Sequence, residues 1–281
     1  LSGTGIGASP TPFNVVLGTA NAGSGTSMQG QLNLTTRGAG TAGDIYVTSS
    51  APLYVNSITT NVADAQTVSI ATTGGNPLTF LNTGVYTGVK GSGTAADGDA
   101  LVVTTGAGGE VTFNKSLEAG SINVNSSGAV IVGSGVNLAT SNIDTGAASA
   151  STGDIVITAA SGISGSGTLT TGSATANTTA TSGKIQLDAG GSTLQLGTLT
   201  TGDATAGTTA VVGDIILSAT GIGTDSTTPQ VVALGTPAAA TPTPGTLNLT
   251  TTGSGSGGDI YIGSAVALNV KDITTVAGDA Q

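Results

Sequence analysis

The residues of this chain that could do chemistry are almost all carboxylates. Its 281 residues include 15 Asp and Glu, five Lys and Arg, and no His or Cys. Without His, a Ser-His-Asp triad and the commonest metal ligand are both excluded. Without Cys, neither a disulfide framework nor a thiolate metal site can form. The carboxylates are therefore the first candidates for catalysis or metal binding.

Asp97 and Asp99 form the closest carboxylate pair in the sequence, within a Gly-rich stretch. Polysaccharide-active β-helix enzymes need carboxylates that converge on one face. The nearest cation in sequence is Lys90, so no Arg or Lys stands beside the pair to neutralise a sugar acid. We interpret the pair as an exposed turn and predict no enzymatic activity. A polysaccharide-active enzyme is the remote alternative.

Four other aspartates each follow a glycine in a recurring motif: Asp44, Asp154, Asp214 and Asp259. Stacked along a repeating fold, they could line one edge and bind Ca²⁺ through oxygen ligands. However, the tandem Gly-Gly-x-Gly-x-Asp pattern of calcium-binding coils is absent, and Lys184 occupies the same position in a fifth copy. We therefore expect corner residues whose side chains accept nearby backbone N–H groups. No cofactor is predicted.

The motif that carries these aspartates reads Gly-polar-apolar-x-apolar. Its glycines, which we interpret as structural corners, are Gly43, Gly153, Gly183, Gly213 and Gly258. The apolar positions alternate with period 2, which indicates a short strand with one buried face. The predicted core residues are Ile45, Val47, Ile155, Ile157, Ile185, Leu187, Ile215, Leu217, Ile260 and Ile262.

The spacing of this motif favours a solenoid over a string of sandwich domains. The copies at Gly153, Gly183 and Gly213 are 30 residues apart, which suits one coil of short strands, whereas sandwich domains would repeat at about 100 residues. Gly and Asn clusters end each strand because these residues enter left-handed conformations cheaply. We therefore predict an all-β solenoid of about ten coils, each stacked on the last. The Thr/Ala/Pro-rich inserts 173–182, 203–212 and 224–245 are interpreted as loops that leave the coil.

A second, longer repeat spans about 215 residues. Residues 32–66 return without a gap as 247–281, and residues 1–7 resemble 217–223. We interpret the chain, 1–281, as one continuous solenoid segment without a domain boundary. Because it stops inside a second copy, we expect it to be an excerpt of a longer tandem array.

At these residues the chain resembles the repeat region of filamentous-haemagglutinin-like proteins of bacterial surfaces. The resemblance is strongest where Gly153-Asp154-Ile155-Val156-Ile157 leads on to Gly167-Thr168-Leu169-Thr170-Thr171-Gly172. It implies a right-handed parallel β-helix that is extracellular or on the cell surface and serves adhesion or a matrix. The shared motif is degenerate and specifies a fold more than a function.

Charge and hydropathy limit the partners. The net charge is −10, and the five cations are scattered, so we predict no nucleic-acid partner. No apolar run of about 18 residues is present, so no transmembrane segment is predicted. The expected partner is the chain itself, continuous or end to end, with lateral bundling. Tyr46 and Tyr261 are either lateral contacts or ordinary surface residues.

From these features we expect a non-catalytic extracellular structural fibre or matrix protein of a bacterial surface. The first alternative is a filamentous adhesin whose loops bind a polysaccharide or a cell-surface ligand. The second is a polymer of separate subunits joined by strand exchange.

Overall fold

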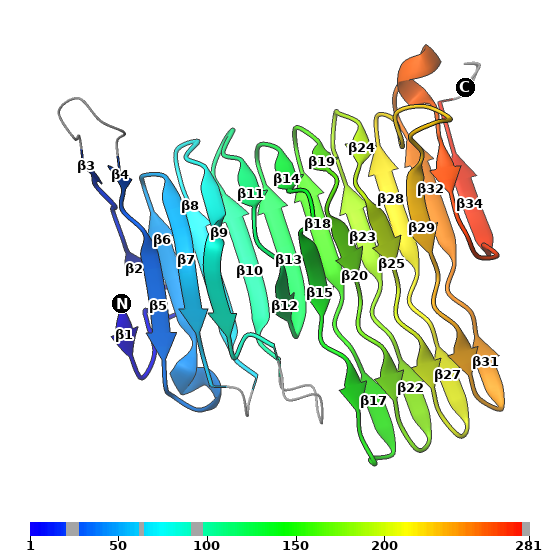
Figure 1. The fold of residues 1–281 in the computed structure, drawn as a ribbon, viewed down its shortest axis with the longest axis horizontal. Helices are drawn as coiled ribbons and strands as arrows, with labels where there is room; N and C mark the ends of the chain where they lie inside the picture. The colour runs from blue at the N-terminus through cyan, green and yellow to red at the C-terminus, as the bar shows by residue number, and fades with distance from the viewer. Residues whose placement is uncertain (21–27, 62–64, 91–97, 277–281) are drawn as a thin grey trace.

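The computed structural model describes residues 1–20, 28–61, 65–90 and 98–276. They form stacked, short, parallel β-strands, one antiparallel pair of β3 (Thr19–Ala20) with β4 (Met28–Gln29), two 3₁₀ turns and no α-helix (Figure 1). The predicted all-β solenoid is thus confirmed, while its right-handedness stays a prediction.

Two long parallel sheets run along the stack, and the chain visits them alternately. Sheet A consists of β1 (Ser2–Gly3), β5 (Leu32–Thr36), β7 (Leu53–Thr59), β9 (Leu78–Thr87), β11 (Val111–Phe113), β14 (Val130–Val132), β19 (Ile163–Gly165) and β24 (Leu194–Gln195). Sheet B consists of β2 (Phe13–Asn14), β6 (Ile45–Ser49), β8 (Thr67–Thr72), β10 (Ala100–Thr105), β13 (Ser121–Ser126), β18 (Ile155–Ala159), β23 (Ile185–Asp188), β28 (Ile215–Ala219), β32 (Leu247–Thr251) and β34 (Val270–Thr274).

The number of coils is slightly smaller than predicted. Sheet A has eight strands and sheet B has ten, which gives about eight full turns rather than about ten. Beyond β24, the ladder of sheet A continues only as single bridges from Leu194 to Ile222 and from Ile222 to Ile260. The end coils are therefore incomplete, which the even spread of apolar triplets in the sequence could not reveal.

Three further sheets widen the later coils. Sheet D consists of β12 (Leu117–Ala119), β15 (Asn137–Thr140), β20 (Thr168–Thr170), β25 (Thr198–Thr200), β29 (Gln230–Ala233) and β33 (Ile262–Gly263). Sheet E consists of β16 (Ile143–Asp144), β21 (Ala174–Thr175), β26 (Ala204–Thr205) and β30 (Pro237–Ala238). Sheet F consists of β17 (Ser149–Ser151), β22 (Thr179–Thr181), β27 (Thr209–Val211) and β31 (Thr241–Thr243).

Each pair of E and F strands forms a finger that projects from the lower edge in Figure 1. The inserts 173–182, 203–212 and 224–245 leave the coil as predicted, but they contain the paired strands of the fingers and are not loops. The side chains buried inside the fingers are mostly alanines, namely Ala174, Ala180, Ala204 and Ala210. Two backbones that approach closely leave room only for side chains of this size, so the fingers lack the large apolar residues that mark a strand in sequence.

Proline marks the end of the finger stack. Pro237 and Pro242 lie in β30 and β31, which pair with Ala204 and Ala210 on one side and are the outermost described strands of sheets E and F. A proline is tolerated at such an edge because no further strand requires its N–H. It also blunts the edge against unwanted pairing.

One continuous core lies between sheets A, B and D. Its inward residues stack on residues of the same kind, as in the column Ile155, Ile185, Ile215 and Leu247. In the aromatic part of the core, Phe80 and Phe113 stack with ring centroids 4.7 Å apart and planes 11° apart. Like residues placed above one another bury apolar area at every step, which is the main stabilising term.

Replacing one stacked ring tests this core. We expect Phe113→Ala to lower the free energy of unfolding by about 3–5 kcal/mol, because a fully buried ring leaves a cavity. The matched control is Phe13→Ala, since Phe13 is 47% exposed and Phe113 is fully buried. Urea denaturation followed by circular dichroism measures both. Equal losses in the two variants would contradict the assignment of the core.

Candidate functional site

Three of the four motif aspartates bind the coil that follows them. The Oδ1 atom of Asp44 accepts the N–H of Thr67 at 2.8 Å, that of Asp154 accepts Lys184 at 2.9 Å, and that of Asp214 accepts Thr246 at 2.7 Å. In every case the donor is the residue directly above the aspartate in the stack. Lys184 and Thr246 immediately precede the next strand of sheet B, and Thr67 is the first residue of that strand. The aspartates are thus clamps between coils.

The aspartates do not converge on a calcium site. Asp154 and Asp214 lie two coils apart with Lys184 between them, a separation of about 9–10 Å at the spacing of a ladder. Ca²⁺ requires oxygens at about 2.3–2.6 Å. The Lys184 ammonium lies 4.0 Å from Asp154 Oδ2 instead. Throughout the described part of the chain, no group of three or more Asp or Glu is placed to hold a metal.

Asp259 differs from the other three aspartates. It precedes Ile260, which bridges Ile222 in line with sheet A rather than sheet B. Its Oδ2 atom accepts the hydroxyl of Tyr261 at 2.8 Å, and this hydrogen bond raises the pKa of Tyr261. Tyr46 makes the same contact with Asp44 at 3.3 Å. Both tyrosines are half-buried, and each hydroxyl is directed to a carboxylate of its own coil.

Of the carboxylate pair Asp97 and Asp99, only Asp99 belongs to the described residues. Asp99 is fully buried, so its interpretation as part of an exposed turn was wrong. It accepts the hydroxyl of Thr60 at 2.6 Å and the N–H of Gln66 at 3.0 Å, both from the preceding coil. A carboxylate enclosed in this way cannot meet a polysaccharide chain. Its donors lie more than 30 residues away in sequence, so no local pattern revealed them.

The corner glycines are required for contact rather than for a left-handed conformation. Gly153, Gly183 and Gly213 have ordinary φ values. A Cβ at Gly153 would overlap the carbonyl oxygen of Gly120, and one at Gly183 that of Gly153. In the same way, a Cβ at Gly213 would overlap the carbonyl oxygen of Gly183, and one at Gly245 that of Gly213. Only glycine allows consecutive backbones to pass this closely.

The two other corner glycines close the 3₁₀ turns. Gly43 is the last residue of η1 (Gly40–Gly43), and Gly258 is the last residue of η2 (Gly255–Gly258). Both are buried, and a Cβ at Gly43 would overlap the side chain of Gln66.

Buried hydroxyls form a second set of clamps, which the sequence interpretation missed. Thr171 Oγ1 accepts the N–H of Gly202 at 3.0 Å and donates to the carbonyl of Gly183 at 2.8 Å. One coil below, Thr140 Oγ1 likewise accepts the N–H of Gly172 and donates to the carbonyl of Gly153. These contacts lie at the neck where each finger leaves the solenoid. The repeated Leu-Thr-Thr-Gly segments were the available signal.

The core positions of the motif follow the two sheets. Eight of the ten are buried in sheet B: Ile45, Val47, Ile155, Ile157, Ile185, Leu187, Ile215 and Leu217. Ile260 and Ile262 are only half-buried and lie in line with sheets A and D. The shared motif would have placed them in sheet B.

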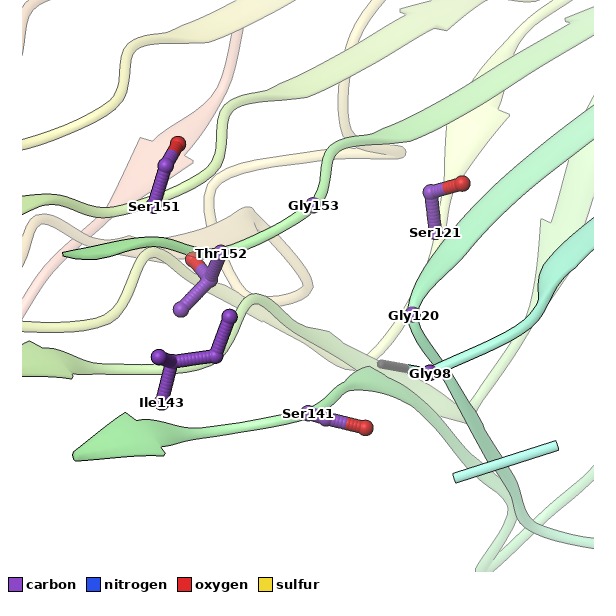
Figure 2. Close-up of a pocket in the computed structure, with 8 residues that line it drawn as sticks. All are labelled: Gly98, Gly120, Ser121, Ser141, Ile143, Ser151, Thr152 and Gly153. Carbon is purple, nitrogen blue, oxygen red and sulfur yellow. The ribbon is translucent and has the colours of Figure 1, made fainter. Parts of the chain in front are cut away.

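A hollow of about 210 Å³ lies at the notch where the first finger begins. Figure 2 shows its lining, which combines the backbone of Gly98, Gly120 and Gly153 with small hydroxyl side chains such as Ser121 and Ser151. None of its lining residues is titratable. The hollow therefore offers hydrogen bonds but no acid, base or charged nucleophile.

No protein-family model, curated protein or solved structure matches this chain. The resemblance to filamentous-haemagglutinin-like repeats stays a prediction from the motif. In the part of the chain that the structure describes, no helix has the length and hydrophobicity needed to cross a membrane.

The glycine column gives a direct test of the close packing between coils. We expect Gly183→Ala to lower the free energy of unfolding by about 1–3 kcal/mol, since its methyl group would press on a backbone carbonyl that cannot move alone. In the control Gly191→Ala, no atom lies within 4 Å of the new methyl group. Its effect should stay within about 0.5 kcal/mol. If urea denaturation shows Gly183→Ala to be as stable as the control, the column is not tightly packed.

Proposed function

We propose that this chain is a segment of a non-catalytic structural fibre outside the cell, part of a bacterial surface or matrix. The observation that carries the proposal is the continuous ladder of sheet B, whose ten strands run from one end of the described chain to the other. A stack of this kind can lengthen by adding coils without changing its cross-section. Its length, rather than a site, is then the functional property.

The use of the polar residues supports a scaffold. Three motif aspartates and the buried threonines bind neighbouring coils, and Asp99, fully buried among the described residues, is bound by groups of the preceding coil. In the described residues the ion pairs are Lys90–Glu118 at 3.1 Å and Lys184–Asp154 at 4.0 Å. Groups that bind neighbouring coils in this way support a structural role for these side chains.

The fingers support a fibre more than an adhesin. Their strands pair in register from one coil to the next, for example Thr179 with Thr209 and Thr209 with Thr241. A binding loop would be expected to depart from this regular pairing. The fingers instead extend the ladder sideways and widen the rod.

Immunogold electron microscopy of cells that express the full-length gene tests this function, with antibodies raised against residues 1–281. We expect label on thin filaments outside the cell, and filaments built of a chain far longer than 281 residues. Label confined to the cytoplasm would refute the proposal. Filaments composed of 281-residue subunits would instead establish the strand-exchanged polymer.

A glycan array with the 281-residue chain separates the fibre from the adhesin. Because the fingers pair regularly from coil to coil and offer no distinct binding loop, we expect no saturable binding and no turnover of polysaccharide. Saturable binding of one glycan class would establish the adhesin in place of the inert fibre.

A further inference from the structure

The two copies of the long repeat have the same local structure. Ile6 bridges Ile45, and its copy Ile222 bridges Ile260. The hydrogen bonds agree as well: the N–H of Ile6 donates to Asp44 O at 3.0 Å, and that of Ile222 donates to Asp259 O at 3.0 Å.

Even an irregularity of pairing is repeated. β5 pairs with β7 with a register shift after Leu32, whose partner is Val55, and β32 pairs with β34 with a shift after Leu247, whose partner is Val270. The two copies therefore share these bridges, hydrogen bonds and the register shift, although the copy of β6 is reduced to the bridge at Ile260 and the two-residue strand β33.

The two copies nevertheless lie on opposite sheets. β5 belongs to sheet A, whereas its copy β32 belongs to sheet B. Figure 1 shows the same exchange at the edges. The 3₁₀ turn η1 lies at the lower edge and its copy η2 at the upper edge. The antiparallel pair of β3 (Thr19–Ala20) and β4 (Met28–Gln29) lies at the upper edge, and finger β30–β31 lies at the lower edge.

The exchange follows from the number of coils in the repeat. β5 precedes β6 by half a coil, and seven steps along sheet B lead from β6 to β32. The repeat thus contains seven and a half coils, or about 36 Å of rod at the spacing of a ladder. A half-integral number turns each copy by half a turn about the rod axis.

The first copy also shows what covers the end of the second. In the first copy, Val55 and Ile58 are fully buried, because β9 pairs above them through Phe80 and Tyr86. Their copies Val270 and Ile273 are 46% and 61% exposed, and β34 is the outermost strand of sheet B in the described chain. Asp44 accepts the N–H of Thr67 from the covering coil, and Asp259 is the copy of Asp44.

We propose that the outer edge of the last coil, formed by β34 with Asp259 and Ile260, is the docking surface for a second copy of segment 67–87. That segment follows in the same polypeptide with its sheets exchanged. Successive 215-residue units are then related by half a turn, and their fingers project from opposite edges of the rod. This proposal describes how the units of the proposed fibre join, and it depends on the proposed function only in requiring that the fibre contains further units.

The test is a chain of residues 1–281 followed directly by a second copy of 67–281, since Gln281 stands where Gln66 stands. Amide hydrogen exchange measures the docking. In the 281-residue chain we expect fast exchange at the β34 amides that face the open edge, and in the extended chain exchange slowed by at least about tenfold. Unchanged exchange would overturn the proposal.

Labelled fingers measure the half turn. The chain has no Cys, so Thr178→Cys in both units places one gold label on an exposed fingertip of each. Electron microscopy should show the two labels on opposite edges of the rod, and labels on one edge would overturn the proposal. The control carries Thr178→Cys and Thr208→Cys in one unit. Thr208 donates its N–H to Thr178 O at 3.1 Å, so both control labels must share an edge.

The two proposals can fail separately. Labels on opposite edges together with cytoplasmic immunogold would retain the half turn and refute the fibre. Extracellular filaments with labels on one edge would refute the half turn alone.

Discussion

Every coil of this rod must satisfy the backbone of the coil above it, at corners as well as in strands. In the strands, peptide groups pair directly. At the corners the chain changes direction, and a buried N–H left there without a hydrogen-bond partner would lower the stability of the fold by about 1–3 kcal/mol. Asp154 and Thr171 supply side-chain oxygens to the N–H groups of Lys184 and Gly202 at these points. The ladder thereby continues around the bends.

The same constraint explains the unusual composition. Glycine stands where one backbone passes directly over another, as at Gly153 and Gly183. Alanine fills the narrow fingers, and threonine closes their necks. Charged side chains are only 7% of the residues, and three of them, Asp44, Asp154 and Asp214, bind the next coil. A chain so fully used in contacts with itself suits a scaffold.

Local pattern predicted the strands, the coil repeat and the corners, because each depends on residues close in sequence. The fingers were missed because Thr179-Ala180-Thr181 lacks a large apolar residue. The burial of Asp99 depends on Thr60, 39 residues earlier. The half-coil offset depends on the summed lengths of the coils. Along sheet B between β6 and β32, these lengths vary from 21 residues between Leu101 and Ile122 to 33 between Val68 and Leu101.

Native-state hydrogen exchange at the corners tests the central claim most directly. If side-chain oxygens continue the ladder, the amides of Gly172, Gly183 and Gly202, each bound to a threonine hydroxyl, will exchange as slowly as the amides within β18 and β23. Fast exchange at these glycines beside slow exchange in the strands would show that the corners are open, and would contradict the account.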